Sequence, residues 1–207
     1  MASGTYFNSL APVQNKGVLT LLGMLVLAGC AAIPSLDMSD GPIEPPGQDI
    51  GIVIGSVLVH TDQEPPDSWF NKLFGRNTAG FDYDFEILRA VDPARPQPPG
   101  EEHYELEVKP AVERIFVARL PFGRYVISSF RYKHTSVLAG ELGLNFVVAP
   151  RTTLYIGRLI LQVPRRVTLG TPYTVEIQNG REATIGALQT QHPGLGRDAL
   201  DALIQAR

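Results

Sequence analysis

An apolar stretch at residues 50–60, with the sequence IGIVIGSVLVH, is the feature that most constrains the fold. β-branched side chains favour strands, and the stretch lacks the alternation of a strand with one wet face. It therefore predicts a central strand that is buried on both faces. Gly51 and Gly55 would leave room on this strand for another backbone or a large side chain.

Short strands and frequent turns are expected for most of the remaining chain. The sequence has 20 Gly and 17 Pro, which indicate many turns and short strands rather than long helices. Residues 81–88 alternate, with aromatic and aliphatic side chains facing one way and acids facing the other. Further strands are expected at residues 104–108, 114–120, 124–132, 144–148, 153–163 and 173–178. About eight short strands predict a mainly β fold, a two-sheet β-sandwich over residues 49–179.

The C-terminal segment, residues 180–207, is expected to be helical. Asn179-Gly180 is a strong hairpin signal, but residues 181–191 also have an apolar side and precede Pro193, so both a hairpin and a short helix are possible. We favour the helix. An apolar stripe formed by Leu195, Leu200, Leu203 and Ile204 predicts a second, last helix.

The N-terminal part of the chain has the pattern of a secretory signal peptide. Lys16 precedes an apolar run at residues 18–27, which small residues follow. The run is about half of the roughly 20 apolar residues that a membrane-spanning helix needs. Residues 1–29 are therefore expected to be removed, which leaves 178 residues with a net charge of −4.

The end of this run, Leu27-Ala28-Gly29-Cys30, resembles the lipobox of bacterial lipoproteins at every position. The resemblance implies transfer of diacylglycerol to the Cys30 sulfur, cleavage between Gly29 and Cys30, and acylation of the new amino terminus. The alternative is an ordinary signal peptide followed by an accidental cysteine, the only one in the chain. In the family, Asp after the cysteine favours retention at the inner membrane, so Ala31 implies the outer membrane. Residues 30–48 are rich in Pro and Gly and are expected to form a tether.

A second resemblance concerns the sandwich. Leu120-Pro-Phe-Gly-Arg-Tyr125 is similar to the LPxGxY corner of prealbumin-like and carboxypeptidase-regulatory-like β-sandwich modules. FVVAP, which ends at Pro150, and the LYIG that ends at Gly157 are similar to stretches of uncharacterised bacterial lipoproteins with that build. The resemblance covers roughly residues 110–163 and implies architecture, because such modules have many functions.

Catalytic and metal chemistry find little support in the sequence. There is no Gly-x-Ser-x-Gly elbow, and Ser128-Ser129 is expected to be a pair of satisfied hydroxyls in a strand. The best local metal cluster surrounds His103, but its acids flank a Pro-rich loop and are better explained as solubilising charge. Asp82, Asp84 and Glu86 are expected to form a solvated strand face, paired with arginines of a neighbouring strand such as Arg114. No cofactor and no metal are therefore predicted.

Aromatic residues offer the one candidate ligand platform. Trp69, Phe70 and Phe74 lie close together in the sequence, and exposed rings of this kind bind sugars; the favoured interpretation is that they plug one end of the sandwich. The mild negative charge gives no basis for nucleic-acid binding. The sequence thus predicts a lipid-anchored, non-enzymatic protein of the outer membrane that faces the periplasm. It would have a structural or accessory role, or belong to a larger assembly with envelope proteins. The alternatives are a binding module for cell-wall glycan or another envelope ligand and, last, a lipid-tethered hydrolase.

Overall fold

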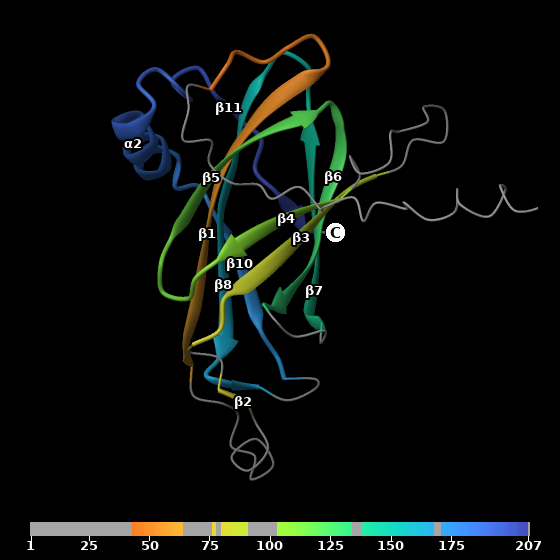
Figure 1. Cartoon of the computed structure of the whole chain (residues 1–207), viewed down its shortest axis with the longest axis vertical. Coiled ribbons are helices and arrows are strands. Elements are labelled where there is room, and N and C mark those ends of the chain that lie inside the picture. The colour runs from red at the N-terminus through yellow and green to blue at the C-terminus, as the bar shows by residue number, and fades with distance from the viewer. Residues whose placement is uncertain are drawn as a thin grey trace, which may run out of the picture. The chain divides into compact units, whose positions relative to one another are not determined.

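The computed structural model describes residues 43–63, 76–77, 80–90, 103–133, 138–167 and 171–206. These residues belong to the second of the two units into which the chain divides, Ala32–Arg207. In this described part, two five-stranded β-sheets pack against each other and one helix lies beside them, while Arg76–Asn77 and Arg166–Val167 form a separate two-stranded sheet (Figure 1). The expected mainly β, two-sheet sandwich is therefore confirmed. The elements are β1 (Ile50–Gln63), β2 (Arg76–Asn77), β3 (Tyr83–Arg89), β4 (His103–Val108), β5 (Arg114–Pro121), β6 (Gly123–Tyr132), β7 (Leu138–Val148), β8 (Thr153–Pro164), β9 (Arg166–Val167), β10 (Thr174–Gln178), α2 (Arg181–Gln191), β11 (Leu200–Asp201) and β12 (Gln205–Ala206).

The first sheet has β1 at its centre. Its strand order is β10-β8-β1-β5, and β11 also pairs with β8. β1 runs antiparallel to β5 and parallel to β8. Residues 51–59 are all buried, because one face of β1 meets the second sheet and the other lies partly under α2. The prediction of a central strand without a wet face is correct.

The second sheet has the order β12-β7-β6-β3-β4. Tyr83, Phe85 and Ile87 of β3 are at most 1% exposed and face the main core, while the acids between them face outward, as the alternation predicted. Leu106, Ile127 and other apolar residues of both sheets complete this core.

The corner between β5 and β6 is tied by three hydrogen bonds. The Tyr125 hydroxyl donates to the Pro121 carbonyl at 2.7 Å, and Arg89 donates to the Phe122 carbonyl at 2.7 Å. The Phe122 backbone N–H donates to Asp49. The early tyrosine of the LPxGxY stretch thus bonds back to the backbone a few residues upstream, as in the tyrosine corner of sandwich domains.

Residues 181–191 form a helix, α2, and not a hairpin. Its buried residues, Thr184, Ile185 and Leu188, face the outer side of the first sheet, where Ile185 and Leu188 join Ile52 and Ile54 in a second apolar cluster. Among the described residues, no helix has the length and apolar character needed to cross a bilayer.

The prediction of a last helix is wrong. After α2 the chain turns, with positive φ at Gly194 (88°) and Gly196 (76°), and then runs extended as β11 and β12. The predicted stripe does not share one face: Leu200 is 59% exposed, whereas Ile204 is buried in the main core. The chain here follows β8 instead of forming a helix: the backbone N–H of Ile204 donates to the carbonyl of Ile156.

Candidate functional site

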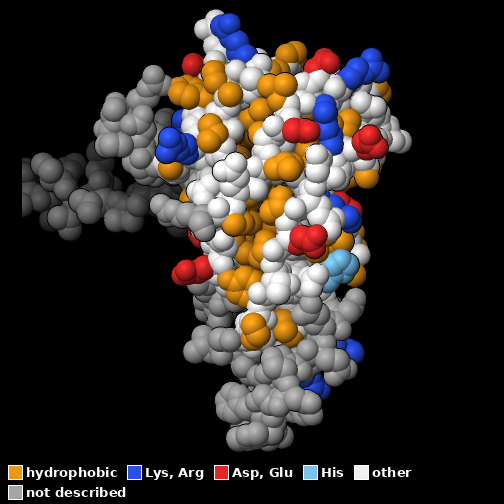
Figure 2. Space-filling model, turned by 180° about the vertical axis from the view of Figure 1, so that it is seen from behind, with side chains coloured by type: hydrophobic (Ala, Val, Ile, Leu, Met, Phe, Trp, Pro, Cys, Tyr) orange, Lys and Arg blue, Asp and Glu red, His pale blue; other side chains and the backbone are white. Residues whose placement is uncertain are grey.

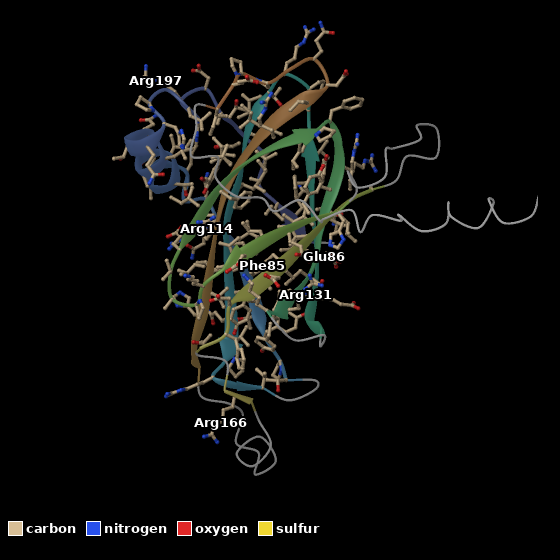
Figure 3. The ribbon with its side chains drawn as sticks, viewed as in Figure 1. Phe85, Glu86, Arg114, Arg131, Arg166 and Arg197 are labelled. Carbon is tan, nitrogen blue, oxygen red and sulfur yellow. The ribbon has the colours of Figure 1, made fainter. Side chains whose placement is uncertain are left out.

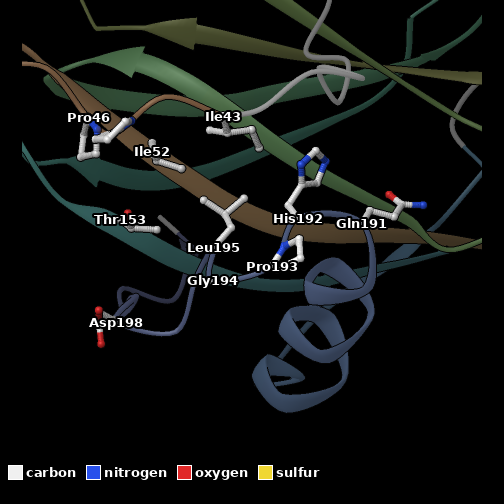
Figure 4. A pocket seen from close by; sticks show the side chains of 12 residues that line it. Ile43, Pro46, Ile52, Thr153, Gln191, His192, Pro193, Gly194, Leu195 and Asp198 are labelled. Atoms are coloured by element: carbon white, nitrogen blue, oxygen red, sulfur yellow. The ribbon is translucent and has the colours of Figure 1, made fainter.

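An open cleft of about 860 Å³ lies between the start of the described chain and the loop that follows α2 (Figure 4). Ile52 at the start of β1 and Thr153 at the start of β8 contribute to its lining. One wall is the segment that contains Ile43 and Pro46, and the other contains His192 and Leu195. Ile43 and Leu195 both pack against the second apolar cluster under α2.

The loop wall is held in place by close packing and by Arg181. A Cβ added to Gly196 would lie 3.0 Å from the Ile54 Cδ1 atom, so glycine allows the loop to approach β1 closely. The Arg181 side chain donates to the carbonyl of Ala199 at 2.6 Å. The Leu195 N–H donates to the His192 carbonyl at 3.1 Å. This wall is therefore preformed.

The opposite wall is part of the segment that the sequence assigned to the tether. Ile43 packs on the apolar cluster, and Glu44 accepts a hydrogen bond from Arg119 of β5 at 3.0 Å. The Ile50 N–H donates to the Gly47 carbonyl at 3.4 Å. Residues 43–48 thus lie against the sandwich.

The cleft is suited to an uncharged or apolar ligand. Among the described residues that line it there is no Lys or Arg, and Asp198 is the one acid. Neither His192 nor Asp198 makes a side-chain hydrogen bond or ion pair with any residue in the described ranges. Its size falls within the range of ligand pockets, about 300–1,000 Å³. The described residues of the lining include no Phe, Tyr or Trp, so they offer a sugar no large aromatic ring on which to stack.

A second candidate cluster, which we call the Glu86 cluster, lies on the outer face of the second sheet. It comprises Glu86, His103, Ser128 and Ser129. β6 has an irregularity opposite β3: Glu86 pairs with Ser129 and Ile87 pairs with Ile127, so Ser128 is an extra residue. Such a bulge lets two successive side chains of one strand face the same residue of its partner. Ser128 and Ser129 donate to Glu86 Oε2 at 2.7 and 2.9 Å.

The same carboxylate meets a histidine on its other oxygen. The Nε2 atom of His103 lies 3.1 Å from Glu86 Oε1. Burial alone would raise the pKa of Glu86, but the hydrogen bonds from Ser128 and Ser129 and the attraction to His103 and Arg131 outweigh it, so the pKa lies below its ordinary value. Glu86 is thus held as an ion.

The order of groups in this cluster differs from that of a nucleophilic triad. There a histidine lies between the serine and the acid, so that it can accept the serine proton. Here the carboxylate lies between the serines and the histidine. The expectation of satisfied hydroxyls at Ser128 and Ser129 agrees with these contacts.

The outward acids of β3 do not pair with Arg114. Arg114 lies at the start of β5, in the other sheet, opposite Val57. Arg131 of β6 lies closer to these acids: its side chain is 3.8 Å from Asp84, and it forms an ion pair with Glu105 of β4. The error arose because sequence alone did not show that β6 lies next to β3.

Several predicted site residues fall outside the described residues. These are Cys30 with the lipobox Leu27, Ala28 and Gly29, and the possible platform Trp69, Phe70 and Phe74. Of the neighbouring aromatics that are described, Tyr83 and Phe85 are buried in the main core, whereas Phe81 is exposed. The ring centroids of Tyr83 and Tyr132 are 5.1 Å apart, and those of Phe81 and Tyr132 are 6.1 Å apart.

Within the described ranges, no three His, Cys, Asp or Glu side chains are grouped as metal ligands would be. His103 meets Glu86 as described above. Among the described residues, the large apolar side chains that are exposed come from several separate segments, and Figure 2 shows apolar patches on one face in a broken band between charged side chains. They are Phe81, Val112, Val147, Leu200 and Leu203.

The cleft was missed by sequence reasoning. Its signal was present in Pro193, Gly194 and Gly196, which end a helix and build a loop, but the sequence does not show that Ile43 returns to face them. No family model matches the sequence, and comparisons with curated proteins and with solved structures find no similar protein.

Proposed function

We propose that this chain is a lipid-anchored protein of the bacterial cell envelope, acylated at Cys30, with its sandwich on the periplasmic side of the outer membrane. Its role is non-enzymatic: structural or accessory, or as a subunit of a larger assembly. The observation that carries the proposal is the sequence Leu27-Ala28-Gly29-Cys30, which ends an apolar run and contains the only cysteine.

Physical chemistry supports an anchor of this kind. A single acyl chain gives only marginal membrane binding, at about 0.8 kcal/mol per buried methylene, and stable anchoring takes more than one. A triacylated Cys30 would supply three chains. The apolar run at residues 18–27 is too short to span the membrane itself.

The polar chemistry of the described residues supports a non-enzymatic role. The Glu86 cluster places an ionised carboxylate between its serines and its histidine, so the histidine does not contact either hydroxyl as a base would. None of its members lines the cleft.

A binding module is the second candidate, and the cleft at Ile43 and Leu195 favours it. The lining suits an uncharged or apolar envelope ligand better than a glycan, because its described residues include no aromatic ring apart from His192. A glycan function would instead depend on Trp69, Phe70 and Phe74, which lie outside the described residues.

Metabolic labelling with a radioactive fatty acid tests the proposal. Wild-type protein is expected to carry label, Cys30→Ala is expected to carry none, and Ala31→Ser, which leaves the four-residue motif intact, is expected to keep it. Mass spectrometry of the mature amino terminus gives a second reading. Label on Cys30→Ala, or a mature chain without fatty acid, contradicts the proposal.

Crosslinking in intact cells followed by mass spectrometry separates the two candidate functions. A subunit or accessory protein is expected to give one recurrent protein partner. A binding module is expected to give none but to retain a small molecule, and Leu195→Glu in the cleft should release that molecule, whereas Val112→Glu, far from the cleft lining, should not.

A further inference from the structure

We infer that the end of the sandwich that carries the cleft faces the membrane, an inference that rests on the proposed lipid anchor at Cys30. We call this end, with Ile43, the corner at Phe122, the turn between β7 and β8, and the loop after α2, the cleft end. The partner it fits is the headgroup layer of a phospholipid bilayer.

The first step is where the chain from the anchor joins the sandwich. Ile43 packs against the apolar cluster under α2, and Glu44 pairs with Arg119. Ile43 is only thirteen positions after Cys30 in the sequence. A fully extended chain spans at most about 3.3–3.6 Å per residue, so Ile43 lies within about 43–47 Å of the anchor.

The second step compares this reach with the length of the sandwich. Ile43 and Ile52 line the same cleft, and β1 runs on from Ile52 for eleven residues to Gln63. At about 3.3 Å per residue this is about 36 Å, and the turn with Arg166 lies beyond it (Figure 3). If the far end of the sandwich, near Arg166, rested on the membrane, the tether would therefore have to be stretched nearly to its maximum length.

The contacts of residues 43–48 with the sandwich decide which of its ends faces the membrane. If the chain were unattached as far as Gln48, eighteen residues would reach about 59–65 Å, and either end of the sandwich could rest on the membrane. The contacts of Ile43 and Glu44 with the sandwich remove this additional length of tether. A domain held by the shorter tether keeps its cleft end nearest the lipid.

The chemistry of the cleft end is compatible with a lipid surface. Arg124, Arg151 and Arg197 are exposed there, and none of the three side chains has a partner among the residues that the structure describes. Arginines near an anionic lipid surface are attracted to it. Asp49 and Asp198 offset part of this charge. Because the domain is already tethered, a weak attraction is sufficient to favour one orientation.

The test places a fluorescent label at single cysteines of the full lipidated protein. Since lipid occupies the sulfur of Cys30, each introduced cysteine is the only free thiol. Leu200→Cys and Val147→Cys lie toward the cleft end, and Val112→Cys lies in the turn between β4 and β5; the three native side chains are 59, 58 and 58% exposed, so the sites are matched. Arg166→Cys marks the far end.

The labelled proteins are reconstituted into vesicles of phosphatidylcholine and phosphatidylglycerol that contain a lipid with a nitroxide on its headgroup. The labels at Leu200→Cys and Val147→Cys are expected to lose most of their fluorescence, and those at Val112→Cys and Arg166→Cys little. Equal quenching at both ends, or stronger quenching at the far end, overturns the inference. Melting temperatures show which labelled variants are folded, and each end has two sites.

Tether variants and a measurement of fatty-acid content test the role of docking and of the lipid anchor separately. A flexible insertion between residues 42 and 43, or the double change Ile43→Asp and Glu44→Lys, lengthens the free tether and is expected to raise quenching at Val112→Cys; no change there overturns the role of docking. Fatty-acid content is measured on the same samples. Absence of lipid contradicts the proposed function, whereas lipidated protein with symmetric quenching contradicts the orientation alone.

Discussion

Glu86 and Ser129 face each other across β3 and β6, and the Ser129 hydroxyl donates to Glu86 Oε2 at 2.9 Å. The bulge in β6 brings Ser128 to the same oxygen, and His103 meets the other one. Three neighbouring side chains therefore hold the Glu86 carboxylate in place on a partly exposed face of the sheet. Two predictions follow from this geometry, and neither depends on the proposed function.

Stability should depend on pH through Glu86. Its pKa is lower in the folded chain than its ordinary value of 4.5, so its stabilising contribution is present above that value and is lost as the pH falls through the folded pKa. The melting temperature of the wild type should exceed that of Glu86→Gln near neutral pH, and the difference should shrink as the pH falls below about 4.5. Thermal melts of both proteins across this range measure it. A difference that stays constant with pH contradicts the prediction.

Removing either serine hydroxyl should weaken the fold through the same carboxylate. A hydrogen bond of this kind contributes about 1 kcal/mol, and more when the acceptor is charged. Ser128→Ala and Ser129→Ala should each lower the melting temperature by about 2–4 °C for each kcal/mol lost in a chain of this size. The control is a double-mutant cycle: in a Glu86→Gln background each loss should be smaller. Equal losses in both backgrounds would show that the hydroxyls act elsewhere.

Much of the sandwich could be predicted because its strands have strong local signals. The unbroken apolar run of β1 and the alternation of β3 indicate burial directly. The stripe of Leu200 and Ile204 was misleading because pairing with β8 and β7 is a long-range interaction that helical spacing does not reveal. Two-residue strands such as β11 have too little sequence to carry a pattern.

The candidate site was less predictable for the same reason. Glu86, Ser128 and Ser129 were each recognised, but their meeting depends on a bulge and on β6 lying beside β3. The cleft requires Ile43 to lie near Leu195, more than 150 residues later in the chain. Only tertiary structure brings such residues together.

The hydroxyl of Tyr125 should contribute to stability at the corner between β5 and β6. Tyr125→Phe removes its hydrogen bond to the Pro121 carbonyl but keeps the ring, which stacks on Phe146 with centroids 5.4 Å apart. The expected loss is about 1 kcal/mol, because the Pro121 carbonyl loses its partner. Denaturant unfolding measures it. An unchanged midpoint would mean that water replaces the hydroxyl.

Two glycine substitutions should shift stability in opposite directions. A Cβ at Gly140 of β7 would lie 2.5 Å from Tyr173 Cε1 and 2.6 Å from Phe130 Cε1, rings that pack edge to face, so Gly140→Ala should destabilise the fold by about 1–3 kcal/mol through overpacking. Gly186 is exposed within α2 and has nothing within 4 Å of the added carbon, so Gly186→Ala should stabilise it by up to about 1 kcal/mol through helix propensity. The two proteins differ from the wild type by the same single methyl group, and thermal melts under identical conditions compare them. A Gly140→Ala protein as stable as the wild type would mean that Tyr173 is free to move away from β7, and a destabilised Gly186→Ala would mean that α2 is not helical at that position.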